Sequence, residues 1–467
     1  MTETAYSPRL RTGVLLCGTG TAGAYQAGAL RAILEAGIKI DVIAAHGAGA
    51  LTALAASVDG GARIWDAAGP WTDPRLRRAY RWRTALRWAF AGLLACLVLL
   101  VSPLLVLVAA AAVYALGTLA ALVSLTGVSA DLFAFYRRGV EALFDPPILP
   151  TILPRVLVLA VLIIAAVLAV SAIQAARGER SRRRVIGAFW WRLLSSPLDA
   201  TEPAALAIET IWGLVRGASN EPRPSPSEVG RRYVDVLADN FGQPGFHEVL
   251  IAVHDLDARQ DLVGAVLGAS ARGAFEARRV GGGPREGETV DLTGPLRETL
   301  VSLLDGALRL PVVTTPATVE FPPASYWRGE RHRLCDRPEL ATRLIDEMAA
   351  IGVEQVILVS PAPPAATPHA LRPRPIDLRA RIGELARAIE TAAIADTAAL
   401  CARRFSSVFL VRPDHNPIGP FDFGGVYDEA SDRQRTVSEL IAQGHADAFH
   451  HFIEPIAGRE MEPAARA

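Results

Sequence analysis

Two glycine-rich turns near the start of the chain have the spacing of an acyl-transfer site. The first turn, Cys17-Gly18-Thr19-Gly20-Thr21-Ala22-Gly23, follows an apolar run, and the second, Ala45-His46-Gly47-Ala48-Gly49, follows another apolar run. In such sites, backbone N–H groups stabilise an oxyanion, and a side chain at the apex of the second turn attacks the carbonyl carbon. The apex here is Gly47, so the attacking side chain is missing.

Few nearby residues can replace that side chain. Cys17 precedes the first turn and His46 adjoins the apex. A cysteine at the end of a strand is usually an inert part of the core, so we expect neither residue to act as a nucleophile.

Other polar clusters favour structural roles. His254, Asp255 and Asp257 fit a turn better than a proton relay. The histidines of the last predicted helix have no carboxylates at metal-ligand spacing, so we expect no metal and no cofactor; they are His445, His450 and His451.

The first turn also fits two other interpretations. A glycine-rich turn between a strand and a helix is typical of dinucleotide binding, but that site requires an acidic residue at the end of the second strand. Asp41 lies at the beginning of that strand instead. The third interpretation is a turn that only allows close helix packing.

Alternating elements must position these turns. We expect strands at about 14–17, 42–46, 248–253, 261–267, 355–360 and 407–411, and helices at about 24–35, 204–216, 296–308, 339–350, 376–403 and 433–452, with a Pro/Ser/Arg-rich linker over 218–232. Apolar strands alternating with helices predict an α/β fold with a mostly parallel sheet covered on both faces.

Two long apolar stretches predict a membrane insertion. Residues 88–130 contain no charge, and residues 156–176 form a second uncharged stretch. A bilayer crossing needs ~20 residues, and as one helix the first stretch would reach roughly 65 Å, so it must break, tilt or lie partly in the interface. Pro103 and Gly117 are candidate breaks, a re-entrant hairpin is an alternative, and residues 131–155 are expected to form a short loop on the far side.

Charged and aromatic flanks indicate the orientation. Arginines precede the first stretch at 75, 77, 78, 81, 83 and 87 and follow the second at 177, 180, 182, 183 and 184; tryptophans flank them at 82, 88, 190 and 191. The positive-inside tendency places both outer flanks in the cytoplasm. We therefore expect a multi-pass membrane protein with a cytoplasmic soluble domain.

Overall charge excludes one class of partner. Positive and negative side chains balance at 48 each, so no basic field would attract nucleic acid. The four cysteines are scattered, without paired C-x-x-C spacing, and are expected to be reduced thiols.

Residues 13–54 resemble the opening of a patatin-like phospholipase. In that family a G-G-G-x-R-G-type loop donates N–H groups and a G-x-S-x-G elbow follows. Gly18, Gly20 and Gly23 match the loop glycines. A stretch over residues 303–360 resembles the region around the family's D-G-G/A motif, and this resemblance puts Asp336 at the position of the aspartate that acts as base, in preference to Asp305 or Asp422.

The resemblance implies a patatin-like three-layer sandwich interrupted by a helical transmembrane insertion. The N-terminal part of the domain would cover residues 1–80, the insertion 81–190 and the C-terminal part 191–467. The implied site comprises the substituted nucleophile position Gly47, the aspartate Asp336 and the oxyanion loop Gly18, Thr19, Gly20, Thr21 and Gly23.

Three positions depart from the family pattern. Gly47 replaces the serine, Ala22 the loop arginine, and Arg337 the glycine after the aspartate. We therefore expect a catalytically impaired, membrane-anchored protein that retains a lipid or acyl-ester cleft for binding or regulation. The alternatives are an active lipid acyl hydrolase with an unrecognised nucleophile and a membrane scaffold; protein partners are not indicated. Serine at position 47 is expected to restore activity that Asp336→Asn abolishes.

Overall fold

The computed structural model describes residues 6–66, 69–178, 196–277, 285–366 and 377–456. The chain divides into two compact units. The first combines Met1–Arg81 with Leu198–Ala467, and the second is Trp82–Pro197. Two segments far apart in the sequence therefore fold together, with the second unit inserted between them.

Within the described residues, the first unit contains a nine-stranded mixed sheet. Its order is β11-β10-β1-β2-β5-β6-β7, with β9 also beside β5 and β8 beside β9. Neighbours from β11 to β5 are parallel, whereas β6 and β9 run antiparallel to β5. The strands are β1 Thr12–Leu16, β2 Val42–Ala45, β5 Glu248–Asp255, β6 Gln260–Val266, β7 Thr289–Asp291, β8 Ala317–Glu320, β9 Arg331–Cys335, β10 Gln355–Val359 and β11 Ser407–Val411.

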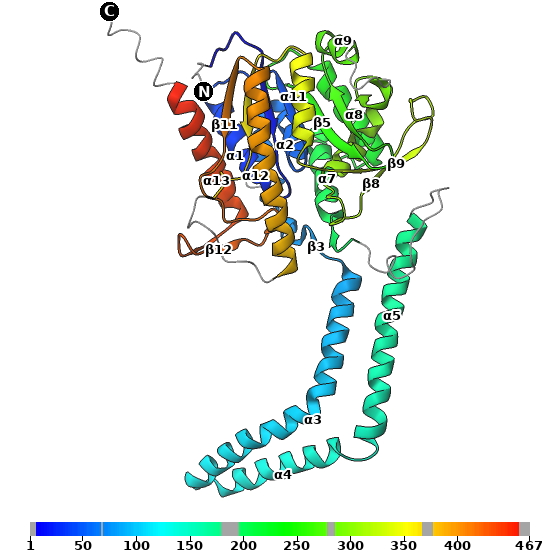
Figure 1. The fold of residues 1–467 in the computed structure, drawn as a ribbon, viewed down its shortest axis with the longest axis vertical. Helices are drawn as coiled ribbons and strands as arrows, with labels where there is room; N and C mark the ends of the chain where they lie inside the picture. The colour runs from blue at the N-terminus through cyan, green and yellow to red at the C-terminus, as the bar shows by residue number, and fades with distance from the viewer. Residues whose placement is uncertain (1–5, 67–68, 179–195, 278–284, 367–376, 457–467) are drawn as a thin grey trace, which may run out of the picture. The chain divides into compact units, whose positions relative to one another are not determined.

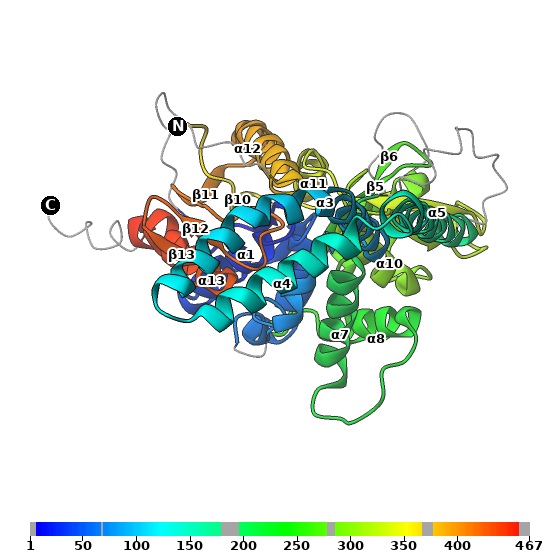
Figure 2. The ribbon, with the colours of Figure 1, turned by 90° about the horizontal axis from the view of Figure 1, so that it is seen from below.

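Helices cover both faces of this sheet (Figure 1). One face carries α9 Ala269–Ala277, α11 Leu340–Ala350 and α12 Leu378–Arg404; the other carries α1 Ala22–Glu35, α2 Gly49–Ala56, α7 Thr201–Arg216, α8 Pro226–Asp239, α10 Leu300–Ala307 and α13 Val437–Ala448. From below, the strands lie between α12 and α1 (Figure 2). The first unit is thus an α/β sandwich.

Continuous apolar strands explain the two covered faces. Val14, Leu15 and Leu16 of β1 are all fully buried although successive side chains point to opposite faces. Leu15 packs in a cluster with Leu344 of α11 and Ile394 of α12. Strand β1 therefore contributes to the apolar core on both faces of the sheet.

Smaller elements complete the first unit. A two-stranded ribbon pairs β12 Val426–Asp428 with β13 Arg433–Arg435, and a second pairs β3 Arg81–Trp82 with β4 Leu198–Asp199 at the boundary of the two units. Short 3-10 helices cover Asp59–Ile64, Pro74–Arg78, Arg285–Gly287 and Arg297–Thr299, and a π-helical turn covers Phe449–Ile453.

Some predicted boundaries were wrong. The expected linker over 218–232 includes the start of α8, because Ser225 caps its N-terminus by accepting from Glu228 N and Pro226 suits its first turn. The expected helix over 433–452 begins only at Val437, because residues 433–435 pair with β12. Strands β7, β8 and β9 were not predicted, since such short strands carry little periodic signal.

The second unit contains three helices in its described part: α3 Thr84–Leu122, α4 Thr126–Leu143 and α5 Leu153–Gly178, with a π-helical turn at Ile148–Ile152 before α5. By length and composition, α3 and residues Leu153–Gln174 of α5 could each cross a membrane. Helix α3 bends along its length; its first part runs beside α5 and its second part beside α4 (Figure 1).

The helical second unit corrects two expectations. Residues 131–155 are not a simple loop, because α4 extends to Leu143. Gly117 does not end α3; it allows close contact, since a Cβ there would lie 2.4 Å from Phe133 Cζ. Pro103 also lies inside α3, where the Ser102 hydroxyl donates to Leu99 O at 2.8 Å. Arg180, Arg182, Arg183, Arg184, Trp190 and Trp191 lie outside the described residues.

Candidate functional site

The elbow between β2 and α2 depends on glycines. Gly47 has φ +60°, a conformation that side-chain-bearing residues rarely adopt. A Cβ at position 47 would lie 2.4 Å from Gly18 O and 2.8 Å from Asp336 Oδ2. At Gly49, a Cβ would lie 2.8 Å from Leu16 O, so this glycine lets α2 approach β1. The sharp turn is present, but the space beside its apex is occupied by backbone.

The glycine loop after β1 is bonded to other parts of the chain. Gly18 has φ +130° and Gly20 has φ +60°. Gly18 O accepts from Ala48 N at 3.0 Å, and Pro420 O accepts from Thr21 N at 3.0 Å. The Thr21 hydroxyl also donates to Gly419 O at 2.9 Å. The N–H groups of Thr21 and of Ala48, the residue after the apex, therefore already have carbonyl partners.

Asp336 lies beside the elbow because of sheet pairing. It directly follows β9, and Cys335 of that strand pairs with His254 of β5. Asp336 Oδ1 lies 2.9 Å from His46 Nδ1, and Oδ2 accepts from the Thr19 hydroxyl at 3.4 Å. The structure thus brings together residues 19, 46, 47 and 336, which are far apart in the sequence.

His46 and Asp336 form a charged pair although both are buried. Both side chains are almost fully buried. Burial alone lowers the pKa of His46, but the Asp336 carboxylate raises that pKa well above its ordinary value. The pair is therefore an imidazolium beside a carboxylate. The carboxylate contacts His46 through Oδ1, while Oδ2 lies on the side of the apex.

Cys17 and Glu390 adjoin this pair. The register of β1 and β2 ends at Leu16 opposite Ala45, so Cys17 and His46 come next on adjacent strands. The nearby Cys17 side chain also raises the pKa of His46. Burial raises the pKa of Glu390 on α12 to about 7, while the nearby Thr19 side chain opposes the rise. The site is therefore a closed polar cluster inside the core.

The two other departures from the family pattern lie at different places. The Cβ of Ala22 would be 2.7 Å from a Cβ at Gly18, so it packs against the glycine loop. The guanidinium of Arg337 turns to β6, where Nη2 lies 2.7 Å from Asp261 Oδ2. Arg337 therefore binds a carboxylate other than that of Asp336.

The remaining candidates lie in other surroundings. Asp305 is on α10 and pairs with Arg309 at 2.7 Å, while Asp422 accepts from Gly419 N at 2.9 Å. Asp41 accepts from Thr12 N at 2.8 Å, at the beginning of β2.

The histidine groups also have local partners. His254 lies 2.8 Å from Asp261, and Asp255 and Asp257 contact His332 and Arg333. His445 and His450 pair with Glu35 and Glu454. No group of three metal-ligating side chains was found among the described residues.

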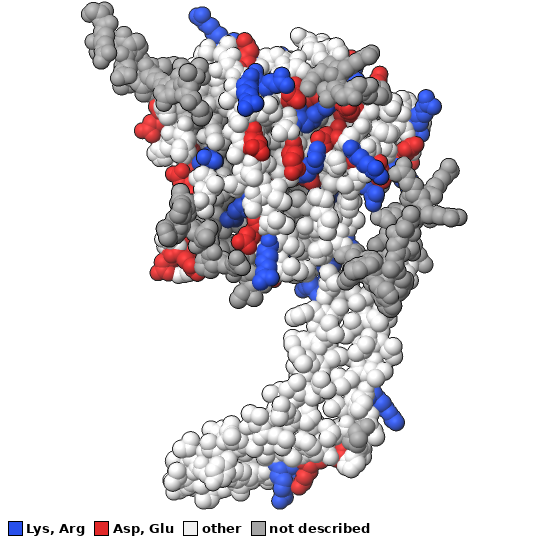
Figure 3. All heavy atoms as spheres, in the orientation of Figure 1, with Lys and Arg blue, Asp and Glu red and all other residues white. Residues whose placement is uncertain are grey.

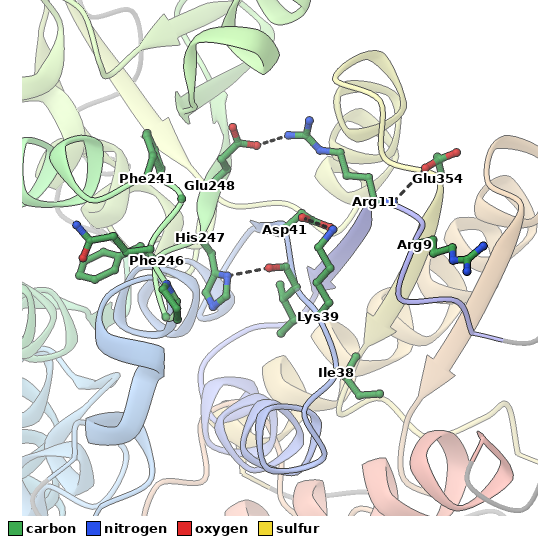
Figure 4. Close-up of a pocket in the computed structure, with 15 residues that line it drawn as sticks. Arg9, Arg11, Ile38, Lys39, Asp41, Phe241, Phe246, His247, Glu248 and Glu354 are labelled. Carbon is green, nitrogen blue, oxygen red and sulfur yellow. Dashed lines mark hydrogen bonds and ion pairs between the residues drawn. The ribbon is translucent and has the colours of Figure 1, made fainter. Parts of the chain in front are cut away.

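A separate hollow lies at the amino-terminal edge of the same sheet. It measures about 680 Å³ and is lined by the segment 241–248 and by residues before β1, β2 and β10 (Figure 4). Arg11 binds Glu248 there, and Lys39 Nζ lies 2.9 Å from Asp41 Oδ1. Because the elbow lies at the carboxyl edge of the sheet, this hollow is not the predicted site.

Sequence reasoning missed three parts of the site. His46 was noted only as a possible nucleophile, whereas it is the ion-pair partner of Asp336. Pro420 and Glu390 carried no local signal, because their roles depend on contacts with Thr21 and Thr19. A buried face on α12 shared by Glu390, Ile394 and Cys401 was the one available hint.

One comparison with known proteins bears on this geometry. Residues 14–100 match the model of the family Patatin-like phospholipase. The match confirms the resemblance inferred from residues 13–54; it does not reach residues 303–360. A search of curated proteins found no match.

Proposed function

Since the match over residues 14–100 supports membership of the patatin-like phospholipase family, we propose that this chain is a membrane-anchored member without ester hydrolase activity. Its role is binding or regulation at a lipid surface. In this proposal Asp336 occupies the position of the catalytic aspartate and Gly47 that of the lost nucleophile.

One observation carries the proposal. The apex residue has no side chain, and Gly18 O takes up the space that a side chain would enter, 2.4 Å from the Cβ position. Acyl transfer by the family mechanism requires a hydroxyl there, so no acyl-enzyme can form at this position. The nearby Asp336 consequently has no proton to accept and binds His46 instead.

The glycine loop supports the same conclusion. Oxyanion stabilisation requires N–H groups that are free to meet the developing charge. Thr21 N and Ala48 N, which belong to the loop and the elbow, both donate to carbonyls of the chain. We infer that residues 419–420 keep the loop in a non-catalytic state.

Membrane anchoring rests on the second unit. Its helices expose large apolar side chains, among them Trp88, Phe90 and Leu162 at 60% or more. Water would be a poor solvent for such a surface, whereas acyl chains suit it. The arginine flanks favour a cytoplasmic first unit.

Hydrolysis can be tested with the full chain in detergent. We expect no turnover of p-nitrophenyl butyrate or octanoate and no labelling by a fluorophosphonate probe. The matched variant is Asp336→Asn, because any hydrolysis that survives this change does not use the elbow. Turnover that is lost in Asp336→Asn contradicts the proposal.

Lipid binding in the first unit needs a probe that separates it from the membrane helices. A photoactivatable fatty acid is expected to crosslink to peptides around residues 18–25 or 416–423. Crosslinks restricted to peptides from residues 84–178 would assign all lipid contacts to the membrane helices and contradict lipid binding by the first unit.

A second candidate function follows from Cys17. Its position beside His46, which in turn binds Asp336, has the order of a thiol, a base and an orienting carboxylate. We rank it second because the Cys17 side chain is 2% exposed. Ester turnover that is abolished by Cys17→Ala would favour this candidate.

A further inference from the structure

Helix α3 is too long for a single crossing. Its 39 residues span about 58 Å as a straight helix, roughly twice a hydrocarbon core. The part before Pro103 spans about 28 Å, which suits one crossing. This first part and α5 form an antiparallel pair, and the rest of the unit, residues 104–143, is named the arm.

Two glycine contacts separate the crossing pair from the arm. A Cβ at Gly92 would lie 2.8 Å from Ile164 Cγ1, so this glycine lets the first part of α3 approach α5. Gly117 does the same for α4, where it meets Phe133. The hydroxyl of Tyr136 also donates to Val106 O at 2.9 Å. The arm is therefore a helical hairpin held by its own contacts.

Helix α4 has three distinct faces. Phe133 and Tyr136 contact α3, and the charged residues of α4 gather on a second face; they are Asp131, Arg137, Arg138 and Glu141. Val128 and Phe135, exposed by 57% and 71%, lie on a third, apolar side, which Asp131 and Arg138 border. In Figure 3, blue and red side chains of the arm lie on its lower side, away from the crossing pair.

We propose that the arm lies along the membrane surface, at the end of the crossing pair opposite to Thr84 and Gly178. Val128 and Phe135 reach the boundary between headgroups and acyl chains, while Arg137 and Arg138 face water. The partner is thus the lipid interface itself. This inference rests on the proposed membrane anchoring.

The charges of α4 decide against two further crossings. Helix α4 spans about 27 Å, enough to cross a core, but a crossing would carry all four charges into the hydrocarbon. Only the pair Arg137 and Glu141 is partly matched, at 3.6 Å, and both side chains are exposed. A surface position instead buries one face and hydrates the other.

The net charge of α4 also predicts which lipids are enough to hold the arm at the membrane surface. Helix α4 has two arginines against one aspartate and one glutamate, so it carries no net charge. Apolar burial, and not attraction to anionic headgroups, then holds the arm. Its depth is expected to be the same in zwitterionic and in anionic vesicles.

Spin labels test the position of the arm. Phe135→Cys and Arg137→Cys, which lie on nearly opposite sides of α4, are prepared in the full chain with Cys96→Ala, because the other three native cysteines are buried. The labelled proteins are reconstituted into vesicles of phosphatidylcholine, with or without phosphatidylglycerol. Accessibility is measured to oxygen, which partitions into acyl chains, and to a water-soluble nickel chelate. A label at Leu162→Cys on α5 reports anchoring itself.

The expected result is an oxygen-to-nickel ratio severalfold higher at position 135 than at 137, unchanged by phosphatidylglycerol. Equal, low ratios at both positions would place the arm in water and overturn the inference. Equal, high ratios would make α4 a crossing and overturn it as well. A low ratio at position 162 would instead overturn membrane anchoring. If Phe135→Cys fails to fold, Val128→Cys and Glu141→Cys give the same comparison.

Discussion

The two units of this protein use similar apolar residues in opposite ways. In the first unit, Leu15 and Leu16 are fully buried between two helical layers. In the second, Leu162 is 60% exposed, and Trp88 and Phe90 are exposed even more. Burial of apolar surface stabilises the first unit from within, whereas the second unit lacks enough neighbours to cover its own surface. Apolar composition therefore does not by itself tell whether a side chain is buried in a core or exposed on a helix.

Polar groups show the same contrast. The His46–Asp336 pair lies in the core, where an unpaired charge is costly. The Arg137–Glu141 pair is exposed on α4, where water compensates for its loss. The comparison can be tested by changing the same kind of group in two different surroundings.

The largest effect is expected from His46→Ala. Removing the histidine leaves Asp336 buried and unpaired, which should lower the free energy of unfolding by about 3–5 kcal/mol. The matched change is His445→Ala, which breaks an exposed pair with Glu35 and should cost at most ~1 kcal/mol. Thermal unfolding of both full-length variants in detergent makes the measurement; equal effects would contradict the buried ion pair.

The contribution of His46 to the free energy of unfolding also depends on pH, and the direction of this dependence can be predicted. Because the folded state raises the pKa of His46, its contribution is fully present below the ordinary pKa of an unfolded histidine, about 6.5. That contribution is lost as the pH rises through the higher folded pKa. The gap in stability between the wild type and His46→Ala should therefore narrow at alkaline pH.

Leucine-to-arginine changes compare the surroundings of the two units directly. Leu162 on α5 and Leu385 on α12 are exposed by 60% and 61%. An arginine at a membrane helix centre costs about 2.5–3.5 kcal/mol of insertion free energy, so Leu162→Arg should reduce the carbonate-resistant fraction of the protein. Leu385→Arg faces water and should leave that fraction unchanged. If both variants changed the carbonate-resistant fraction equally, Leu162 and Leu385 would not differ in their surroundings, and the proposed membrane position of Leu162 would be contradicted.

Glu390→Gln tests how burial of a single carboxyl group changes the pH dependence of stability. The pKa of Glu390 rises from 4.5 to about 7 through burial, so the folded state holds a proton that the unfolded state releases. Stability should fall between pH 4.5 and 7, by roughly 3 kcal/mol in total. The glutamine variant should escape this loss and exceed the wild type most at pH 8. The exposed Glu384→Gln on the same helix is the control and should show no such pH-dependent gain.

The smallest expected effect concerns the elbow. Gly47→Ala and Gly37→Ala both place a side chain at positive φ, at +60° and +69°, but nothing lies within 4 Å of a Cβ at Gly37. The clash with Gly18 O should make the first variant less stable by a further 1–3 kcal/mol, an estimate of about the cost of overpacking. Denaturant unfolding of the two variants measures the difference.

The same clash changes the expectation for Gly47→Ser. From the sequence, serine was expected to restore activity. The structure leaves no room for its Cβ unless Gly18 moves, so we now expect an unstable and inactive variant. Ester turnover in Gly47→Ser would show that the loop can open.

Prediction from the sequence succeeded where the signal was local. Residues 13–54 revealed a strand, a glycine loop, a helix and an elbow, because glycine spacing and apolar periodicity depend on neighbouring residues. The helices α11 and α12 were also located within a few residues. In contrast, α4 was expected to be a loop, since its amphipathic pattern followed a long apolar stretch that dominated the interpretation.

Contacts between distant residues were beyond such reasoning. Nothing near His46 indicates that it binds Asp336, 290 positions away, and nothing near Thr21 points to Pro420. These contacts arise because β9 pairs with β5 and because the segment after β11 returns to the glycine loop. Packing of the whole sheet selects them.

The sequence alone determined that the elbow lacks a nucleophile, because a glycine carries no reactive group in any conformation. It also determined that residues 88–130 and 156–176 carry no charged side chain and are long enough to cross a membrane. Only the tertiary structure decided what fills the site. Gly18 O, His46 and Pro420 O reached Gly47, Asp336 and Thr21 through strand pairing and loop return, which depend on the free energy of the folded chain as a whole.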